Sequence, residues 1–513
     1  MLSTLKSKYM VRIMILIIVI LVSFSLNPIY TSPVESSEKA GFLILMPDEK
    51  WVKALSNERF FEERSKKYNV YIAFPPKKVT SEIRKLIIDY KQMDENLKYL
   101  LIVGDYKNIP PYSFDKGYMG FKETFVTDYY YTDLIGKYPW EIHFPPDLSA
   151  GRIWAKDFNE AKEKLDAILD YESKPQLNYP LSFCGGFIPM FDDGWVLKDQ
   201  SYLGEEMKKL TKGKIVTMYE VEGDKKTAFK PILPINIENV VDISTKSPIT
   251  VIYDSNRYIW YDSNKNKKVD WDELIERQLI TEDMVFNGIT VLGYSFGGTV
   301  AKVQENFHQF SPIQICFTSD LIFVDTYWTL KSDCWLDTQL LYLLEGFLKN
   351  GSIGENISQQ MVAFYNDFGC STTSSTCFLR TIHYNLMGMQ FFGDPTMELP
   401  DFRLSEIPKI EISEELDIGY KSKVECKIKN TGNLTLLCKI IESPSWIKLS
   451  FNECEIKPKD EVILTVELLT DYHSYDEFFD CQIPSKQLAG LISILTNDPK
   501  KPRFEIKVKA KVL

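Results

Sequence analysis

From residue 40 onward, short runs of apolar residues alternate with amphipathic segments. Residues 41–46, 68–74 and 98–105 ("GFLILM", "YNVYIAF" and "KYLLIVGD") are almost continuously apolar. Such runs are typical of parallel strands that are covered on both faces. Between the second and third run, residues 80–90 repeat apolar side chains at helical spacing. The first part of the chain therefore predicts strands and helices in alternation.

The same pattern returns after residue 180. The apolar runs "SFCGGF", "KIVTMYE", "SPITVIYD", "NGITVLGYS" and "PIQICFTS" are separated by helical patterns such as "WLDTQLLYLLEGFLKNG". Strand, helix and strand in this order favour an α/β fold with parallel sheets flanked by helices. We predict two α/β subdomains, at residues 33–180 and 181–403.

Near residue 403 the pattern changes to a period of two. In "VECKIKN", Val424, Cys426 and Ile428 alternate with charged residues, and "FEIKVKAKV" near the end of the chain alternates in the same way. This alternation is typical of antiparallel strands with one face in water. Residues 404–513 therefore predict an all-β sandwich of the immunoglobulin-like type.

The N-terminal segment predicts export. Lysine and arginine side chains before position 13 precede an apolar run over residues 13–22, which continues weakly to Leu26. A run of this length suits a signal peptide, which we place at residues 1–32. If the signal stays uncleaved, residues 11–26 would anchor the chain in a membrane. Either outcome predicts a protein that is secreted or held on the extracellular surface.

The charge balance argues against nucleic acid as a partner. The chain has 71 acidic and 60 basic residues, a net charge of -11, and no basic stripe that could neutralise phosphates. Its 513 residues are 44% hydrophobic, which is enough for two or three folded domains.

Nine cysteines in a chain of this length do not form a disulfide framework. Two pairs are nevertheless suggestive in an oxidising compartment. Cys370 and Cys377 bracket a polar loop, and Cys426 and Cys438 are equidistant from the turn "NTGN", which would place them opposite each other on a hairpin.

Five segments between residues 40 and 400 carry a family resemblance. In order they are "YLLIVGDYKNIPPY", "TDYYYTDL", "DLSAGRIWAKDFNEAKEKLDAILDYE", "GSIGENISQQM" and "MGMQFFGDPTMEL". Together they resemble the gingipain-type cysteine peptidases of the caspase-like clan, in which an immunoglobulin-like domain often follows. The resemblance implies a caspase-like α/β region and a polypeptide as substrate or ligand.

The resemblance also implies where catalytic residues should lie. In the family, a His-Gly pair follows one strand and a cysteine follows the next. Here Asp254 and Ser295 occupy those positions. Carboxylate is about 2.6 pKa units less basic than imidazole, and a serine hydroxyl ionises far less readily than a thiol. We therefore predict a pseudopeptidase that binds polypeptide without cutting it.

Two enzymatic alternatives stay open. Cysteine-type endopeptidase activity could use relocated residues, with His308 acting on Cys316 or Cys334. A serine hydrolase could use Ser295, because residues 293–297 read G-x-S-x-G. Its remaining residues would be Asp320 or Asp325 with His383.

The segment "DSNKNKKVDWDE", residues 262–273, predicts a calcium loop. Hard oxygen donors at alternating positions are what Ca²⁺ requires. Lys267 stands where such a loop normally has glycine, and a helix is expected to follow in "LIERQL". The predicted ligands are Asp262, Asn264, Asn266, the backbone carbonyl of Lys268, Asp270 and Glu273.

Overall fold

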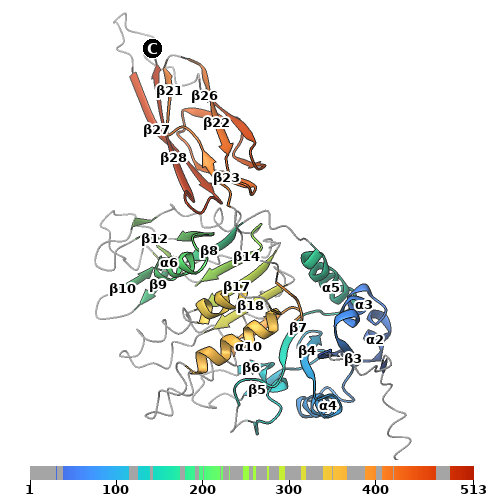
Figure 1. Ribbon diagram of the computed structural model, residues 1–513. Coiled ribbons are helices and arrows are strands. Elements are labelled where there is room, and N and C mark those ends of the chain that lie inside the picture. The colour runs from blue at the N-terminus through green and yellow to red at the C-terminus, as the bar shows by residue number, and fades with distance from the viewer. Residues whose placement is uncertain are drawn as a thin grey trace, which may run out of the picture.

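The structure is a computed structural model, and it divides into an α/β region and a β-sandwich that stands at one end of it (Figure 1). The residues that the structure describes are 30–31, 39–114, 125–138, 143–173, 180–185, 187–190, 196–199, 201–219, 221–222, 230–231, 246–253, 258–260, 274–276, 288–294, 313–318, 339–348, 351–366, 388–399, 407–419, 421–469 and 486–512.

An eleven-stranded sheet forms the centre of the α/β region. Its strands, in spatial order, are β1 (Tyr30–Thr31), β3 (Asn69–Ala73), β2 (Gly41–Leu45), β4 (Leu97–Val103), β7 (Ser149–Ile153), β19 (Gln390–Phe392), β18 (Ile313–Thr318), β17 (Ile289–Tyr294), β14 (Ile249–Tyr253), β8 (Leu181–Gly185) and β11 (Ile215–Tyr219).

Apart from β1, which pairs with β3 in antiparallel fashion, the sheet consists of two parallel blocks. Strands β3, β2, β4, β7 and β19 run in one direction, and β18, β17, β14, β8 and β11 run in the other. The blocks meet where β18 and β19 pair in antiparallel fashion. Strands from the two predicted subdomains meet one step away, at β7 and β19, where Arg152 is opposite Phe392. The parallel α/β prediction is confirmed, and both parts contribute to one sheet.

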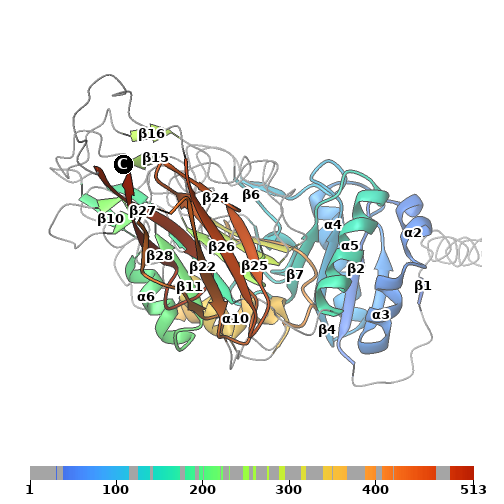
Figure 2. The ribbon, with the colours of Figure 1, turned by 90° about the horizontal axis from the view of Figure 1, so that it is seen from above.

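Helices cover both faces of this sheet, because successive strand residues point to opposite sides. Phe42 and Ile44 of β2 pack with one set of helices, whereas Leu43 and Leu45 pack with α4 (Thr80–Met93). The helices on the first face include α2 (Glu49–Leu55), α3 (Arg59–Lys67), α5 (Phe158–Ser173), α6 (Ser201–Leu210) and α10 (Ile353–Phe364). Figure 2 shows several of these helices from above.

Shorter elements line the borders of the sheet. The three-residue 3-10 helix η2 (Tyr129–Tyr131) packs against α4. The two-stranded hairpins are β5 (Tyr112–Phe114) with β6 (Phe125–Thr127), β9 (Phe187–Met190) with β10 (Val196–Asp199), β12 (Val221–Glu222) with β13 (Lys230–Pro231), and β15 (Tyr258–Trp260) with β16 (Leu274–Glu276).

The C-terminal part is a sandwich of two sheets. One sheet has the order β20 (Ile410–Glu411), β22 (Lys423–Asn430), β26 (Glu461–Leu468) and β24 (Ile447–Leu449). The other has the order β21 (Glu415–Gly419), β28 (Arg503–Val512), β27 (Lys486–Thr496), β23 (Leu436–Glu442) and β25 (Glu453–Ile456). Cys426 and Ile428 are buried between the sheets, whereas Lys427 is exposed. The predicted alternation and all-β fold are confirmed.

The predicted pairing of Cys426 with Cys438 is wrong. Cys426 on β22 is opposite Leu464, and Cys438 on β23 is opposite Cys454. The turn between β22 and β23 does not close a hairpin, since it carries the chain from one sheet to the other.

The side chain of Asn430 fixes this change of sheet. Its Nδ2 donates to the carbonyl oxygens of Leu434 at 2.7 Å and Ile456 at 2.9 Å. Its Oδ1 accepts from the backbone N–H of Gly432 at 2.9 Å. A turn that satisfies its buried polar groups in this way has no need of the hairpin hydrogen bonds.

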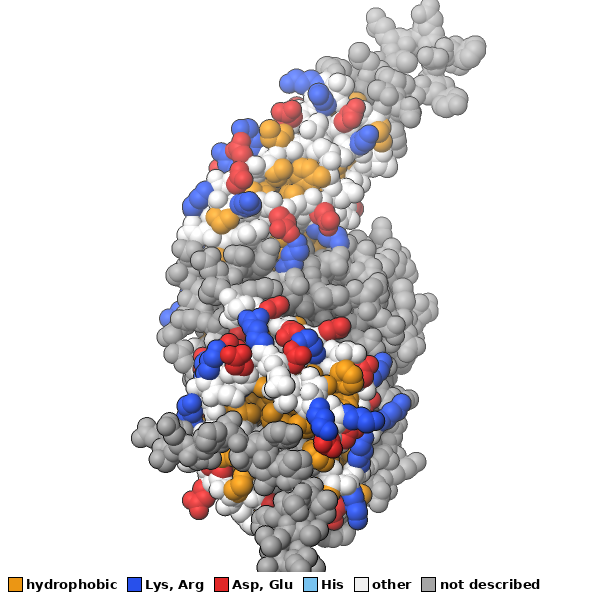
Figure 3. All heavy atoms as spheres, turned by 90° about the vertical axis from the view of Figure 1, so that its right-hand side faces the viewer, with side chains coloured by type: hydrophobic (Ala, Val, Ile, Leu, Met, Phe, Trp, Pro, Cys, Tyr) orange, Lys and Arg blue, Asp and Glu red, His pale blue; other side chains and the backbone are white. Residues whose placement is uncertain are grey.

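Among the described residues, an ion pair joins the sandwich to the α/β region. Lys246, three residues before β14, binds Glu455 of β25. Figure 1 shows the sandwich next to β8 and β14, on the side away from β3 and β4. In the surface view of Figure 3, acidic and basic side chains are interspersed over the described part of the visible face.

The predicted signal peptide lies outside the described residues, apart from Tyr30 and Thr31. Among the helices that the structure does describe, none is long and apolar enough to span a membrane.

Candidate functional site

The carboxyl ends of β14 and β17 lie side by side. These strands are parallel neighbours, with Tyr253 opposite Gly293, so each ends at the same edge of the sheet. Asp254 follows β14 directly and Ser295 follows β17 directly. Both residues lie outside the described part of the chain, but the two strand ends that precede them are brought together as predicted. We call this place the strand-end site.

At the opposite ends of these strands, close backbone packing sets their position. The carbonyl oxygen of Pro248 accepts from the N–H of Ile289 at 2.9 Å and from the hydroxyl of Tyr171 at 3.0 Å. A Cβ on Gly288 would lie 2.3 Å from the same oxygen, so only glycine fits there. Buried Ser182 and Ser247 are also hydrogen-bonded to each other. These contacts therefore hold the N-terminal ends of β14 and β17 in register with each other.

The alternative catalytic residues are placed only in part. Cys316 lies within β18, opposite Leu292 of β17 and Gln390 of β19, two residues before the strand ends at Thr318. Its backbone is thus flanked by strands on both sides, not at the sheet edge. His308 and Cys334 lie outside the described residues.

The predicted calcium loop is bracketed by a hairpin. Trp260 of β15 is opposite Leu274 of β16, so the two ends of segment 261–273 are adjacent. The helix expected after this segment is not observed, because Leu274–Glu276 form a strand by pairing with β15. The six predicted ligands themselves lie outside the described residues. Among the residues that are described, no group of three or more metal-binding side chains gathers.

A small cavity lies beside the seam where β7 meets β19. Its volume is about 50 Å³, and its lining includes Asp128, Gln390 and Ile357. That is room for one or two water molecules and not for a peptide side chain. Gln390 is buried, and its Nε2 has no hydrogen-bond partner among the described residues.

Arg152 of β7 binds the loops that follow β4 and β6. Its guanidinium binds Asp128 through two hydrogen bonds of 2.7 Å and also donates to the carbonyl oxygens of Gly104 and Ile109. Burial lowers the pKa of Arg152, but the Asp128 carboxylate outweighs this effect and raises the pKa overall. Asp128 and Arg152 lie in two of the segments that carry the family resemblance, and these contacts give both residues structural roles.

Two further segments that carry the family resemblance meet at the turn after β19. The N–H of Gly354, in the first turn of α10, donates to the carbonyl oxygen of Pro395 at 3.0 Å, and that of Ile353 donates to Met397 at 2.9 Å. A Cβ on Gly354 would lie 2.8 Å from this proline, so glycine allows the approach. Segments 351–361 and 392–399, which both carry the family resemblance, are thus packed against each other.

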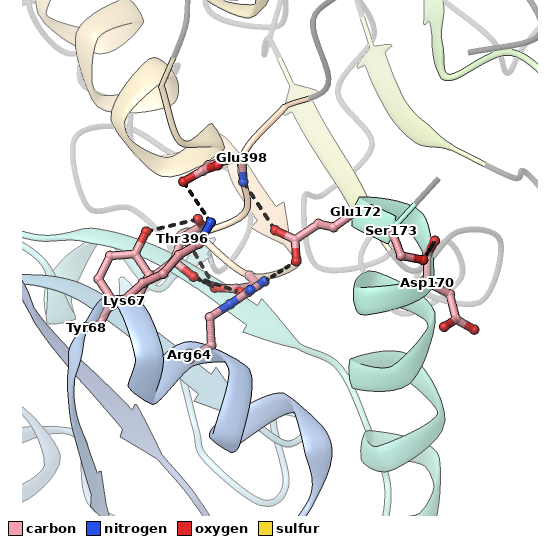
Figure 4. Close-up of polar contacts among 9 residues, drawn as sticks. Arg64, Lys67, Tyr68, Asp170, Glu172, Ser173, Thr396 and Glu398 are labelled. Atoms are coloured by element: carbon pink, nitrogen blue, oxygen red, sulfur yellow. Dashed lines mark hydrogen bonds and ion pairs between the residues drawn. The ribbon is translucent and has the colours of Figure 1, made fainter. Parts of the chain in front are cut away.

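A buried ion triad fixes the same turn from the other side (Figure 4). Arg64 of α3 binds Asp394 at 2.6 Å and Glu172 of α5 at 2.7 Å. Burial lowers the pKa of Arg64, but both carboxylates raise it and prevail. Burial raises the pKa of Glu172 against the opposing effect of Arg64.

Sequence reasoning did not single out Arg64 or Glu172. A signal was present, since Arg64 follows Phe60 and Phe61 at helical spacing and so lies on the buried stripe of α3. An arginine on such a stripe needs a buried acidic partner.

Comparison with known proteins bears on the identity of the α/β region. Residues 39–230 match the family model described as Peptidase family C25. The match supports, over this part of the chain, the resemblance to the gingipain-type cysteine peptidases. The matched segment ends before Asp254 and Ser295. No curated protein matches the chain.

Several solved structures are similar to this chain at low identity. The Arg-specific cysteine proteinase gingipain R has 12% identity and a TM-score of 0.46, with 93% of this chain and 100% of that chain covered. A complex of RgpB pro- and mature domains from Porphyromonas gingivalis has 11% identity and a TM-score of 0.46, with 92% and 100% covered.

Proposed function

We propose that this protein is a non-catalytic, gingipain-type polypeptide-binding protein that is secreted or held on the cell surface. The observation that carries the proposal is the adjacency of two parallel strand ends that lead into Asp254 and Ser295. In the family resemblance, imidazole and thiol groups follow the corresponding strands. In this proposal the scaffold for a nucleophile and its base is retained while the reactive groups differ.

The chemistry of the two side chains supports binding over hydrolysis. A carboxylate with an ordinary pKa near 4 is a weak base at neutral pH, and a serine beside it has no group to accept its proton efficiently. Both side chains can still accept or donate hydrogen bonds to a peptide backbone. The exposed N–H and C=O groups of an extended peptide are suitable partners at such an edge.

The proposal is tested by measuring polypeptide binding. Fluorescently labelled unfolded casein is titrated with residues 33–513, and anisotropy reports the complex. Ser295→Trp should weaken binding at least about tenfold, because a bulky ring at the site removes close contacts. The matched control is Val79→Trp at the start of α4, where the native side chain is 49% exposed. Equal binding by both variants and the wild type would refute a strand-end site.

The same preparation separates the enzymatic alternatives. Loss of casein cleavage after alkylation of thiols would indicate a relocated cysteine, Cys316 or Cys334, with His308. Labelling by a fluorophosphonate that disappears in Ser295→Ala would indicate a serine hydrolase. The non-catalytic reading predicts neither response.

We further propose that the loop between β15 and β16 binds Ca²⁺ through the six predicted ligands. What supports this is the hairpin of β15 and β16, which brings both ends of the loop together. Its first strand begins at Tyr258, four residues after Asp254. Bound calcium would add two positive charges and hold the oxygen-rich loop in one conformation. In this proposal the ion is structural, and no chemical step depends on it.

A further inference from the structure

Two cysteines of the sandwich lie directly opposite each other on neighbouring strands. Cys438 of β23 and Cys454 of β25 are register partners in an antiparallel pair, and both are thiols in this structure. Cα atoms of directly opposed residues in such a pair are about 4.5–5.5 Å apart. Disulfides accept Cα separations of about 4.4–6.8 Å, so the backbone already has a suitable spacing.

The two side chains also point to the same side of their sheet. Cys438 is buried in the core between the two sheets, and partly buried Cys454 packs against that core. Directly opposed residues of an antiparallel pair lie on the same face of the sheet. The burial of both cysteines against the core agrees with this rule. No rotation of either strand is needed to bring the sulfur atoms together.

The thiols already interact. Their hydrogen bond raises the pKa of Cys438, and burial acts in the same direction. The same hydrogen bond lowers the pKa of Cys454, against the effect of burial. Cys454 is the more accessible sulfur and the one that ionises first, so it is suited to attack a disulfide from solution.

We propose that Cys438 and Cys454 form a cross-strand disulfide by exchange with a small-molecule disulfide such as oxidised glutathione. The Cys454 thiolate attacks one sulfur of oxidised glutathione and releases one glutathione thiolate, leaving a mixed disulfide. Cys438 loses its proton and attacks the Cys454 sulfur, and the second glutathione thiolate leaves. Two protein thiols are oxidised and one glutathione disulfide is reduced to two glutathione molecules.

The position of the pair gives the bond a structural consequence. β25 is the edge strand of its sheet, and the residue after Cys454 is Glu455, which binds Lys246 of the α/β region. Lys246 precedes β14, one of the two strands of the strand-end site. A disulfide would tie the edge strand, and with it this contact, to the interior strand β23.

The test maps the disulfide in the full chain. Protein made in a bacterial cytoplasm is fully reduced, freed of reductant, oxidised with glutathione disulfide, alkylated and digested with trypsin. Residues 430–439 and 449–459 form two tryptic peptides with one cysteine each. We expect most of both peptides as one linked species that dithiothreitol separates. We also expect the oxidised protein to unfold at a higher temperature than the reduced protein.

Three variants make the result specific. Cys454→Ser and Cys438→Ser should each abolish the linked peptide and the rise in unfolding temperature. Cys426→Ser removes a buried thiol from the other sheet and should change neither. Circular dichroism verifies that the samples are folded. Recovery of both wild-type peptides as alkylated thiols or as glutathione adducts, from folded protein, would overturn the proposal.

Discussion

At the scale of single residues, buried charges and amides hold the segments that carry the family resemblance. Asp394 is fully buried and is satisfied by Arg64 together with the N–H and hydroxyl of Thr396. Such a group is stabilising only while its partners remain, because an unpaired buried charge has lost its hydration. The triad thus makes the turn after β19 depend on α3 and α5.

Arg64→Met should destabilise the α/β region strongly. The change leaves the buried Asp394 carboxylate and the partly buried Glu172 carboxylate beside an apolar side chain, which costs about 3–5 kcal/mol. Urea unfolding followed by far-ultraviolet circular dichroism measures the loss. The matched control is Arg59→Met on the same helix, whose pair with Asp170 is more than half exposed and contributes less than about 1 kcal/mol. Similar losses in both variants would contradict the role of the triad.

Asn430→Ala should destabilise the sandwich. The change leaves buried carbonyl oxygens of Leu434 and Ile456 without their donor, at a cost of about 1–3 kcal/mol in the free energy of unfolding. Exposed Asn452→Ala is the control and should stay within about 0.5 kcal/mol of wild type. A neutral Asn430→Ala would mean that the backbone alone fixes the change of sheet.

At the scale of elements, apolar runs predicted strands well because burial on both faces leaves little choice of residue. All five residues of β2 are buried, as the run "GFLILM" predicted. The predicted helix over residues 80–90 is present in α4, where Ile83, Ile87 and Tyr90 are buried. These predictions succeed because the spacing of apolar residues along a strand or helix decides which of its faces becomes buried.

Other elements could not be predicted because their form depends on distant partners. "LIE" at residues 274–276 has no strong local preference and becomes a strand by pairing with β15. The local sequence of the turn "NTGN" predicts a hairpin. The side chain of Asn430 instead donates a hydrogen bond to the carbonyl oxygen of Ile456, which is 26 residues further along the chain. At the candidate site, the resemblance predicted that Asp254 and Ser295 follow neighbouring strands, and β14 and β17 are indeed parallel neighbours in the sheet.

The loop between β15 and β16 provides a prediction at this scale. Added Ca²⁺ should raise the temperature of unfolding, and EGTA should reverse the rise, since a ligand of the folded state alone stabilises it. Glu273→Gln should weaken calcium binding in titration calorimetry at least about tenfold by removing a bidentate carboxylate. Glu95→Gln, at an exposed position after α4, is the control. Identical melting with Ca²⁺ and with EGTA, together with no heat of binding, would remove the calcium proposal.

At the scale of the whole molecule, buried tyrosines link stability to alkaline pH. Burial raises the pKa of Tyr68 and of Tyr71 to about 12 and raises that of Tyr131 further. In the unfolded chain these groups titrate near pH 10. The unfolded chain therefore releases protons that the folded chain retains, and stability falls as pH rises above about 10.

Urea unfolding at a series of pH values tests this dependence. The stabilising contribution of these tyrosines is complete below about pH 10 and is lost as pH rises toward about 12. The loss is at most about 1.4 kcal/mol per pH unit for each group, and solvent screening makes it smaller for the less buried Tyr68 and Tyr71. Tyr68→Phe should reduce the slope. An unfolding free energy that stays constant from about pH 9 to pH 11 would contradict the account.

The central claim, that this protein binds polypeptide without cutting it, is our proposal and belongs to the scale of the whole molecule. Two blocks of strands share one sheet, and the ends of β14 and β17 meet at one edge of it, ahead of Asp254 and Ser295. The most direct measurement is cleavage of a diverse peptide mixture by purified residues 33–513 under reducing conditions, analysed by mass spectrometry. The account predicts no new peptide ends. Cleavage that Cys316→Ala, Cys334→Ala or Ser295→Ala abolishes would contradict it.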